Sequence, residues 1–191
     1  MTHKMHLSWP RSVAVYAVLL SFAAALGAQK QSTPAQTAQS AEWKSYSYPA
    51  DGFSATFPAE PSMQKKNVPT DAGTFELRAY LAQDGEAAIF VGVCDYGAAV
   101  ANRDPDTVLD GAQQGAIDNV SAHLVSGKKT TFGIYHGRVF EAENDSMHFS
   151  ARIYLVGTTL YQTLTAAPLG PLYSGSTRFL DSFQLIARVP K

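Results

Sequence analysis

The strongest pattern of apolar and polar positions lies in residues 149–166. Two runs rich in β-branched, aromatic and aliphatic residues flank the dipeptide Gly157-Thr158, which predicts a β-hairpin whose two-residue turn begins with glycine. Such a turn places Val156 opposite Thr159 and sets the register of the whole pair. One face of the hairpin then carries apolar side chains that other elements must cover: Phe149, Ala151, Ile153, Leu155, Leu160 and Leu164.

Two further runs predict strands. Residues 74–81 alternate apolar with polar side chains, a pattern typical of a strand that is buried on one face. Residues 87–96 are apolar at both odd and even positions, which indicates a strand in the middle of a sheet covered on both faces. Cys94, the single cysteine of the chain, lies in this run, so we expect a buried thiol and no internal disulfide.

Two segments predict helices. The dipeptide Asp104-Pro105 is typical of a helix start, with aspartate as the N-cap and proline as the first helical residue. Apolar residues then recur at helical spacing as far as Val120, and we expect this helix to end before Ser126. A second, short helix is expected over residues 176–183. It would bring three apolar side chains onto the sheet: Phe179, Leu180 and Phe183.

Residues 130–142 predict one more strand, in which Gly133 and Gly137 would make bulges or bends. A tight turn would join this strand to the hairpin and place Ala142 opposite Phe149. Together these elements predict an α+β domain, with an antiparallel sheet of about five to seven strands and one long and one short helix packed on it.

The same register gathers polar side chains on the opposite face of these strands. Glu143 lies opposite His148, Glu141 is the next residue on that face, and Arg152 is diagonally adjacent. In the sequence this is the only place where opposite charges and an imidazole are brought together. The four residues are a weak candidate binding face, for a small ligand or for a metal ion between Glu143 and His148. The alternative interpretation is a solvated strand face, because zinc takes three or four well-placed ligands.

The N-terminus has the order of a secretory signal peptide. Basic residues precede an apolar run, and the small residues at 25–28 offer a cleavage site. We interpret residues 1–28 as a signal peptide, residues 29–42 as a linker of Gln, Ser, Thr and Ala, and residues 43–191 as a single domain. The alternative is an uncleaved membrane anchor, although the apolar run is shorter than the roughly 20 residues that a spanning helix needs.

Composition adds few constraints. The chain has 191 residues, is 46% hydrophobic and 16% charged, and carries a formal net charge of −1. These values are typical of one folded domain with extra segments. Without an excess of basic residues, nothing indicates a nucleic acid or an anionic membrane surface as a partner. We expect contact with a membrane only through an uncleaved N-terminal segment.

Several short motifs resemble those of known proteins. They are DGFSATFP at 51–58, LDGA at 109–112, RIYLVG at 152–157, LYQ at 160–162 and FLDSF at 179–183. Over about residues 46–186 the chain resembles uncharacterised exported bacterial proteins and, more distantly, the PsbP-like α/β/α sandwich. The resemblance implies a PsbP-like fold and a non-catalytic accessory role, and it carries over no catalytic signature and no cofactor.

Three functional hypotheses follow. The first is an exported accessory domain, periplasmic or extracellular, that binds an unknown protein or cell-envelope partner through a sheet face or a sheet edge. The second is a small-ligand or metal-binding protein that uses the face of Glu141, Glu143, His148 and Arg152. The third is a hydrolase whose site cannot be read from the sequence. No nucleophile, base and orienting group can be assembled from sequence alone, which argues against an enzyme. We therefore assign no catalytic, cofactor-binding or metal-binding residue.

If residues 1–28 are a cleaved signal peptide, the mature chain should begin at Ala28 or Gln29. Mass spectrometry of the N-terminal peptide, after purification of the exported protein through a C-terminal tag, measures this directly. A mature protein that retains the apolar run would contradict cleavage and indicate the anchor instead.

Overall fold

The computed structural model describes residues 42–70 and 73–189. The predicted signal peptide and all of the predicted linker except Glu42 lie outside the described residues. Ten strands, two α-helices and one short 3-10 helix follow one another along the described chain: β1 (Lys44–Tyr48), β2 (Phe53–Phe57), β3 (Ser62–Thr70), β4 (Gly73–Asp84), β5 (Ala87–Asp95), the 3-10 helix η1 (Gly97–Ala99), α1 (Pro105–Asn119), β6 (His123–Phe132), β7 (Tyr135–Glu143), β8 (Met147–Val156), β9 (Thr159–Pro168), α2 (Gly175–Ser182) and β10 (Gln184–Leu185).

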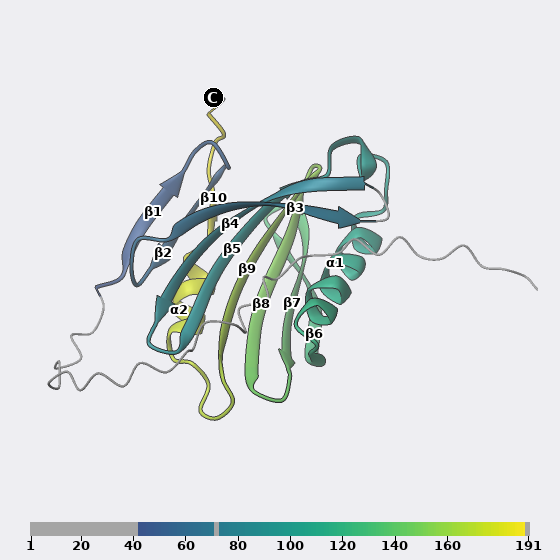
Figure 1. Ribbon diagram of the computed structural model, residues 1–191. Helices are drawn as coiled ribbons and strands as arrows, with labels where there is room; N and C mark the ends of the chain where they lie inside the picture. The colour runs from purple at the N-terminus through teal and green to yellow at the C-terminus, as the bar shows by residue number, and fades with distance from the viewer. Residues whose placement is uncertain (1–41, 71–72, 190–191) are drawn as a thin grey trace, which may run out of the picture.

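The strands form two antiparallel sheets. Seven of them make a large sheet in the order β3-β4-β5-β9-β8-β7-β6, and the other three make a small sheet in the order β1-β2-β10. α1 packs on β6, β7 and β8 on one face of the large sheet, whereas α2 lies on the other face, against β8, β9 and the small sheet's β2 (Figure 1). The predicted α+β class, with an antiparallel sheet and one long and one short helix, is confirmed.

The predicted central hairpin is present in the predicted register. Val156 pairs with Thr159, and Gly157 turns the chain at a φ of +60°, which glycine adopts without a steric penalty. β5, predicted from its apolar run to be central, lies between β4 and β9. Nine of the ten residues of β9 are buried, so this strand is covered on both faces of the sheet.

The chain between α1 and β7 differs from the prediction. α1 ends at Asn119, before Ser126 as expected, because the backbone turns at Ser121, whose φ is +51°. β6 then begins at His123, seven residues before the predicted strand, and includes Ser126. Eight of the ten residues of β6 are exposed, so the strand shows no alternation of buried and exposed positions that could reveal it.

The single strand predicted over residues 130–142 is wrong as well. Gly133, at a φ of +58°, and Ile134 form a two-residue turn that separates β6 from β7. Gly137 lies in a regular strand pair, and its missing Cβ makes room for the ring of Tyr154, whose Cδ1 would lie 2.5 Å from an added Cβ. The bulge of this hairpin lies at Val125 instead.

The small sheet and β3 were also not predicted as such. β10 is an edge strand of the small sheet, where it pairs with β2. β3 is an edge of the large sheet, and six of its nine residues in succession are exposed. None of the helices in the described residues is long and apolar enough to cross a membrane.

Two buried clusters lie on the two faces of the large sheet. The cluster beneath α1 joins helix residues such as Leu109 and Ala112 to strand residues such as Phe140 and Ile153. The cluster on the other face is largely aromatic, and α2 and the small sheet cover it. Its buried members are Phe53, Ala55, Phe57, Tyr80, Ala82, Ile89, Val91, Val93, Tyr154, Tyr161, Phe179, Leu180 and Phe183.

Replacement of Phe183 by alanine should destabilise the fold by about 3–5 kcal/mol, because a large buried ring is lost and a cavity remains. Phe183 is 2% exposed, and its ring centroid lies 5.8–6.1 Å from those of Phe53, Phe132, Tyr154 and Tyr161. Urea unfolding measures the change. Leu172→Ala, at a side chain that is 72% exposed, is the control and should change the free energy of unfolding by less than about 0.5 kcal/mol.

Candidate functional site

The polar face predicted on β7 and β8 forms in the structure. Glu143 pairs with His148 across the strands, and Nδ1 of His148 lies 2.9 Å from a Glu143 carboxylate oxygen. Nε2 of the same ring lies 2.8 Å from a Glu141 oxygen. Ionised carboxylates only accept hydrogen bonds, so both contacts are satisfied together when the imidazole is protonated on both nitrogens.

Arg152 shares this face but does not join the two glutamates. Its guanidinium donates to the Asp181 carboxylate and, at 3.3 Å, to the Leu180 carbonyl, and both acceptors belong to α2. Arg152 thus ties the end of α2 to β8. Within residues 42–70 and 73–189, no group of three or more His, Cys, Asp and Glu side chains is arranged to hold a metal ion.

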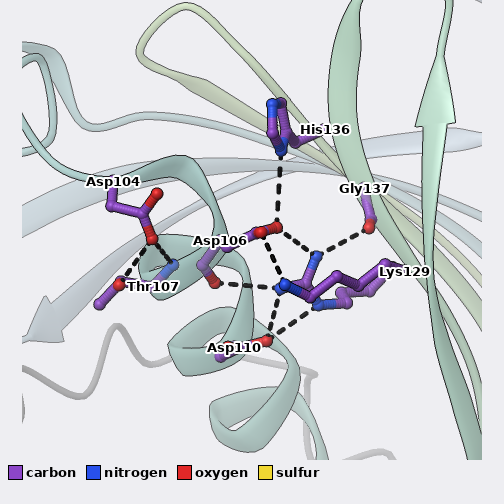
Figure 2. A network of polar contacts seen from close by, with 8 residues as sticks. Asp104, Asp106, Thr107, Asp110, Lys129, His136 and Gly137 are labelled. Atoms are coloured by element: carbon purple, nitrogen blue, oxygen red, sulfur yellow. Dashed lines mark hydrogen bonds and ion pairs between the residues drawn. The ribbon is translucent and has the colours of Figure 1, made fainter.

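A second charged cluster, on the opposite face of the sheet, joins β6 and β7 to α1 (Figure 2). Arg138 of β7 is its centre, with a side chain only 4% exposed. Its guanidinium makes five hydrogen bonds: two to Asp110 Oδ1 at 2.9 and 2.7 Å, one each to the side chain and carbonyl of Asp106 at 2.9 and 3.2 Å, and one to the Gly137 carbonyl at 3.0 Å. All donors of this buried group are therefore satisfied.

Asp106 also receives contacts from the strand surface. Lys129 Nζ lies 2.7 Å from Oδ2, and His136 Nδ1 lies 3.5 Å from Oδ1 (Figure 2). Hydrogen bonds from Lys129 and Arg138 hold the pKa of Asp106 far below its ordinary value. Opposite charges and an imidazole thus meet here too, so the expectation that they meet only around His148 is wrong.

This cluster fixes the position of α1 on the sheet. Asp104 caps α1 by accepting from the Thr107 N–H at 2.9 Å, and Asp106 and Asp110 then anchor the first turns of the helix to β6 and β7. The sequence carries a signal for this cluster, because Arg138 lies on the same face of β7 as the buried Phe140 and Ala142. An arginine at a core-facing position needs partners, and Asp106 and Asp110, four residues apart, share one helix face.

Beside this cluster, the outer edge of β6 pairs with no other strand of the described chain. β6 is the last strand of the large sheet, eight of its ten residues are exposed, and Leu124 and Val125 are 47% and 51% exposed. The register shifts at Val125, which is the extra residue of a bulge. An edge strand of this kind presents unpaired backbone N–H and C=O groups to any extended chain that approaches it.

A hollow of about 220 Å³ lies beside this edge, between β6 and α1. It is lined by residues of α1, β6 and β7: Asp110, Gln113, Leu124, Gly127, Lys128, Lys129 and Arg138. Gly127 keeps it open, because an added Cβ would meet Phe140, Gln113 and Leu124 at 3.5–3.6 Å without a clash. The hollow and the edge of β6 together form the candidate site, which we call the β6 edge.

Cys94 is buried, as predicted, at 4% exposure. Burial raises the pKa of its thiol to about 11, so the thiolate is scarce at neutral pH. The thiol therefore packs in the core and takes no part in the candidate site.

Comparison with known proteins adds a likeness of fold. No protein-family model matches the chain, and no curated protein matches it. A similar solved structure is that of cyanobacterial PsbP (CyanoP) from Synechocystis sp. PCC 6803. It is 14% identical, with a TM-score of 0.48, over 80% of this chain and 98% of that one. A similarity of this size concerns the arrangement of the backbone alone.

The two contacts of His148 make stability depend on pH. Partial burial lowers the pKa of His148, but hydrogen bonds to Glu143 and Glu141 outweigh it, and the net shift is upward. A raised folded-state pKa gives stability that is complete below the ordinary pKa of about 6.5 and is lost as pH rises through the folded value.

His148→Gln should therefore reduce the free energy of unfolding more at pH 5.5 than at pH 8.5, by up to about 1 kcal/mol of difference. Chemical denaturation at the two pH values measures it. His123→Gln, at an exposed position of β6, is the control. An equal effect of His148→Gln at both pH values would show that the ring is neutral in this contact.

Proposed function

We propose that the protein is an exported, non-catalytic accessory domain that binds an extended segment of a partner protein along the β6 edge. Export is supported by the signal-peptide pattern at residues 1–28. The single observation that carries partner binding is that a ten-residue edge strand is exposed, while the Arg138 cluster ties its neighbour β7 and its own Lys129 to α1. A preformed edge can bind an added strand with little further ordering cost on its own side.

The shape of the edge favours an inserted side chain. In a strand added to β6, alternate side chains would point toward α1 and toward the polar face. Those on the α1 side would enter the hollow over Gly127, with Leu124 as an apolar wall. A small side chain fits this space, which gives the site a means of specificity beyond backbone hydrogen bonds.

The charge of the edge favours an acidic segment. The ionisable residues of β6 are His123, Lys128 and Lys129, and none of the three is acidic. Lys129 is paired with Asp106, whereas no carboxylate pairs with Lys128 among the described residues. Positive charge on an edge opposes pairing with a second copy of the same edge and attracts a negatively charged strand.

The other edge of the large sheet is less suited to this role. In β3, Pro69 lacks a backbone donor, and Lys65 is engaged by Glu76 at 3.2 Å. β3 therefore supplies the matched control surface, with an exposed lysine, Lys66, in a position comparable to Lys128.

The test is site-specific photo-crosslinking of the full-length chain in its native cells, with a photoreactive residue at position 128 or at position 66. We expect position 128, and not position 66, to cross-link to one dominant protein, through a segment with acidic and small residues. Equal yields at both positions, or a linked residue in a folded surface instead of an extended segment, would contradict the proposal.

A synthetic peptide of the linked segment then tests the hollow. Gly127→Val should lower its affinity for the full chain at least tenfold, because the added methyl groups fill the space while valine suits a strand. Thr131→Val, an exposed position on the same strand face outside the hollow, should leave the affinity unchanged. Equal affinities for both variants would exclude the hollow as the binding site.

A further inference from the structure

A second concavity, of about 350 Å³, lies between the turn of the β8–β9 hairpin and the small sheet. Tyr135, Val156, Leu185 and Ile186 provide aromatic and aliphatic walls. Thr159, Tyr161 and Arg188 provide its polar groups. A volume of this size lies within the range of small-molecule pockets.

The backbone around Arg188 is held in place by the turn that precedes β2. The Ile186 N–H donates to the Gly52 carbonyl at 2.9 Å, and the Val189 N–H donates to the Pro49 carbonyl at 3.0 Å. Gly52 has a φ of +74°, and a Cβ at this position would lie 2.8 Å from Arg188 Cγ. The arginine side chain thus passes directly over a glycine that no other residue could replace without displacing it.

The guanidinium of Arg188 is oriented by neutral groups. Its Nη2 donates to the Thr159 hydroxyl at 3.0 Å and to the Tyr161 hydroxyl at 3.2 Å. Tyr161 in turn donates to the Asp51 carbonyl at 2.7 Å, which fixes the phenol. Thr159 and Tyr161 are 3% and 2% exposed, so both acceptors are rigid parts of the core.

The charge of Arg188 has no carboxylate partner at contact distance within the described residues. Asp95 interacts with it electrostatically, but Asp95 Oδ1 accepts instead from the Gly97 N–H at 3.0 Å and the Thr158 hydroxyl at 2.8 Å. By contrast, the nearby Arg78 is paired with Asp51 at 2.5 Å. Nε and Nη1 of Arg188 make no hydrogen bond in the described chain, so three of the five guanidinium N–H groups are left without a protein acceptor there.

We propose that this cleft binds a small molecule that combines a carboxylate with a compact apolar body. The N–H groups of Nε and Nη1 of Arg188 can donate charge-assisted hydrogen bonds to a carboxylate, and the adjacent hydrophobic walls accept a ring or a branched chain. The residues of the β6 edge do not line the cleft, so this site is independent of the proposed partner surface.

The test is an NMR titration of the full chain with three probes: phenylacetate, its neutral analogue phenylacetamide, and inorganic phosphate. We expect phenylacetate to shift the methyl signals of Val156, Leu185 and Ile186 and to bind with a dissociation constant on the order of 1 mM. Phenylacetamide and phosphate should each bind at least tenfold more weakly, because one lacks the charge and the other lacks the apolar body.

Variants of Arg188 test whether this residue recognises the carboxylate. Arg188→Met should remove the preference for phenylacetate over phenylacetamide, and Arg188→Lys should retain only part of it, since lysine keeps the charge but loses the planar array of fixed donors. Arg103→Met is the control, because Arg103 contacts only the Ala99 carbonyl, in the η1 segment outside the cleft.

The proposal is overturned by any of three results: no saturable shift with phenylacetate, equal affinity for acid and amide, or an unchanged preference in Arg188→Met. Phosphate binding as tight as phenylacetate binding would also overturn it, because a bare oxyanion site would then suffice. Arg188 makes two hydrogen bonds to buried hydroxyls, so the melting temperature of each variant is measured as well, and a cooperative transition reports that the fold is intact.

Discussion

The structure depends on the burial of both faces of β9. A strand in the middle of a seven-stranded sheet exposes apolar surface on two sides, and each side needs its own cover. α1 supplies the cover on one side, while α2 and the small sheet supply it on the other. The segment 168–174 leads the chain from β9 to α2, and the β1–β2 hairpin lies on the same face of the large sheet. The N-terminal and C-terminal parts of the domain thus cover this face together.

The aromatic layer shows how segments distant in sequence are joined. Phe183 follows α2 and stacks among rings from β2, β6, β8 and β9. Polar groups at the border of this layer continue the same linkage: Tyr80 and Arg78 of β4 both bond to Asp51, in the turn between β1 and β2. Apolar burial thus holds the small sheet in place, and buried hydrogen bonds determine its position.

Most charged groups near the sheet hold elements together. Arg138 anchors α1, Arg152 anchors α2 and Arg78 anchors the turn before β2. Lys128 on the β6 edge and Arg188 in the cleft have no carboxylate partner at contact distance in the described chain, and the same holds for Lys66, Arg103 and Arg178. Each proposed site combines one such unpaired basic group with a concavity beside it.

The sequence by itself determined the elements whose chemistry is local. Period-two alternation and a Gly-first turn predict the β8–β9 pair and its register, and an Asp-Pro N-cap predicts the start of α1. The contact of Glu143 with His148 follows from register alone. β3 and β6 were missed because edge strands exposed on both faces carry no alternation, so nothing local distinguishes them from loops.

Only the tertiary structure decided how distant residues combine. Arg138 meets Asp106 and Asp110, and Arg188 meets Thr159 and Tyr161, across separations of about 30 residues in the chain. Which cations are neutralised depends on how helix and small sheet pack against the large sheet, and this packing is set by burial of surface summed over the whole domain. For that reason the predicted polar face could be located from the sequence, whereas the β6 edge and the Arg188 cleft could not.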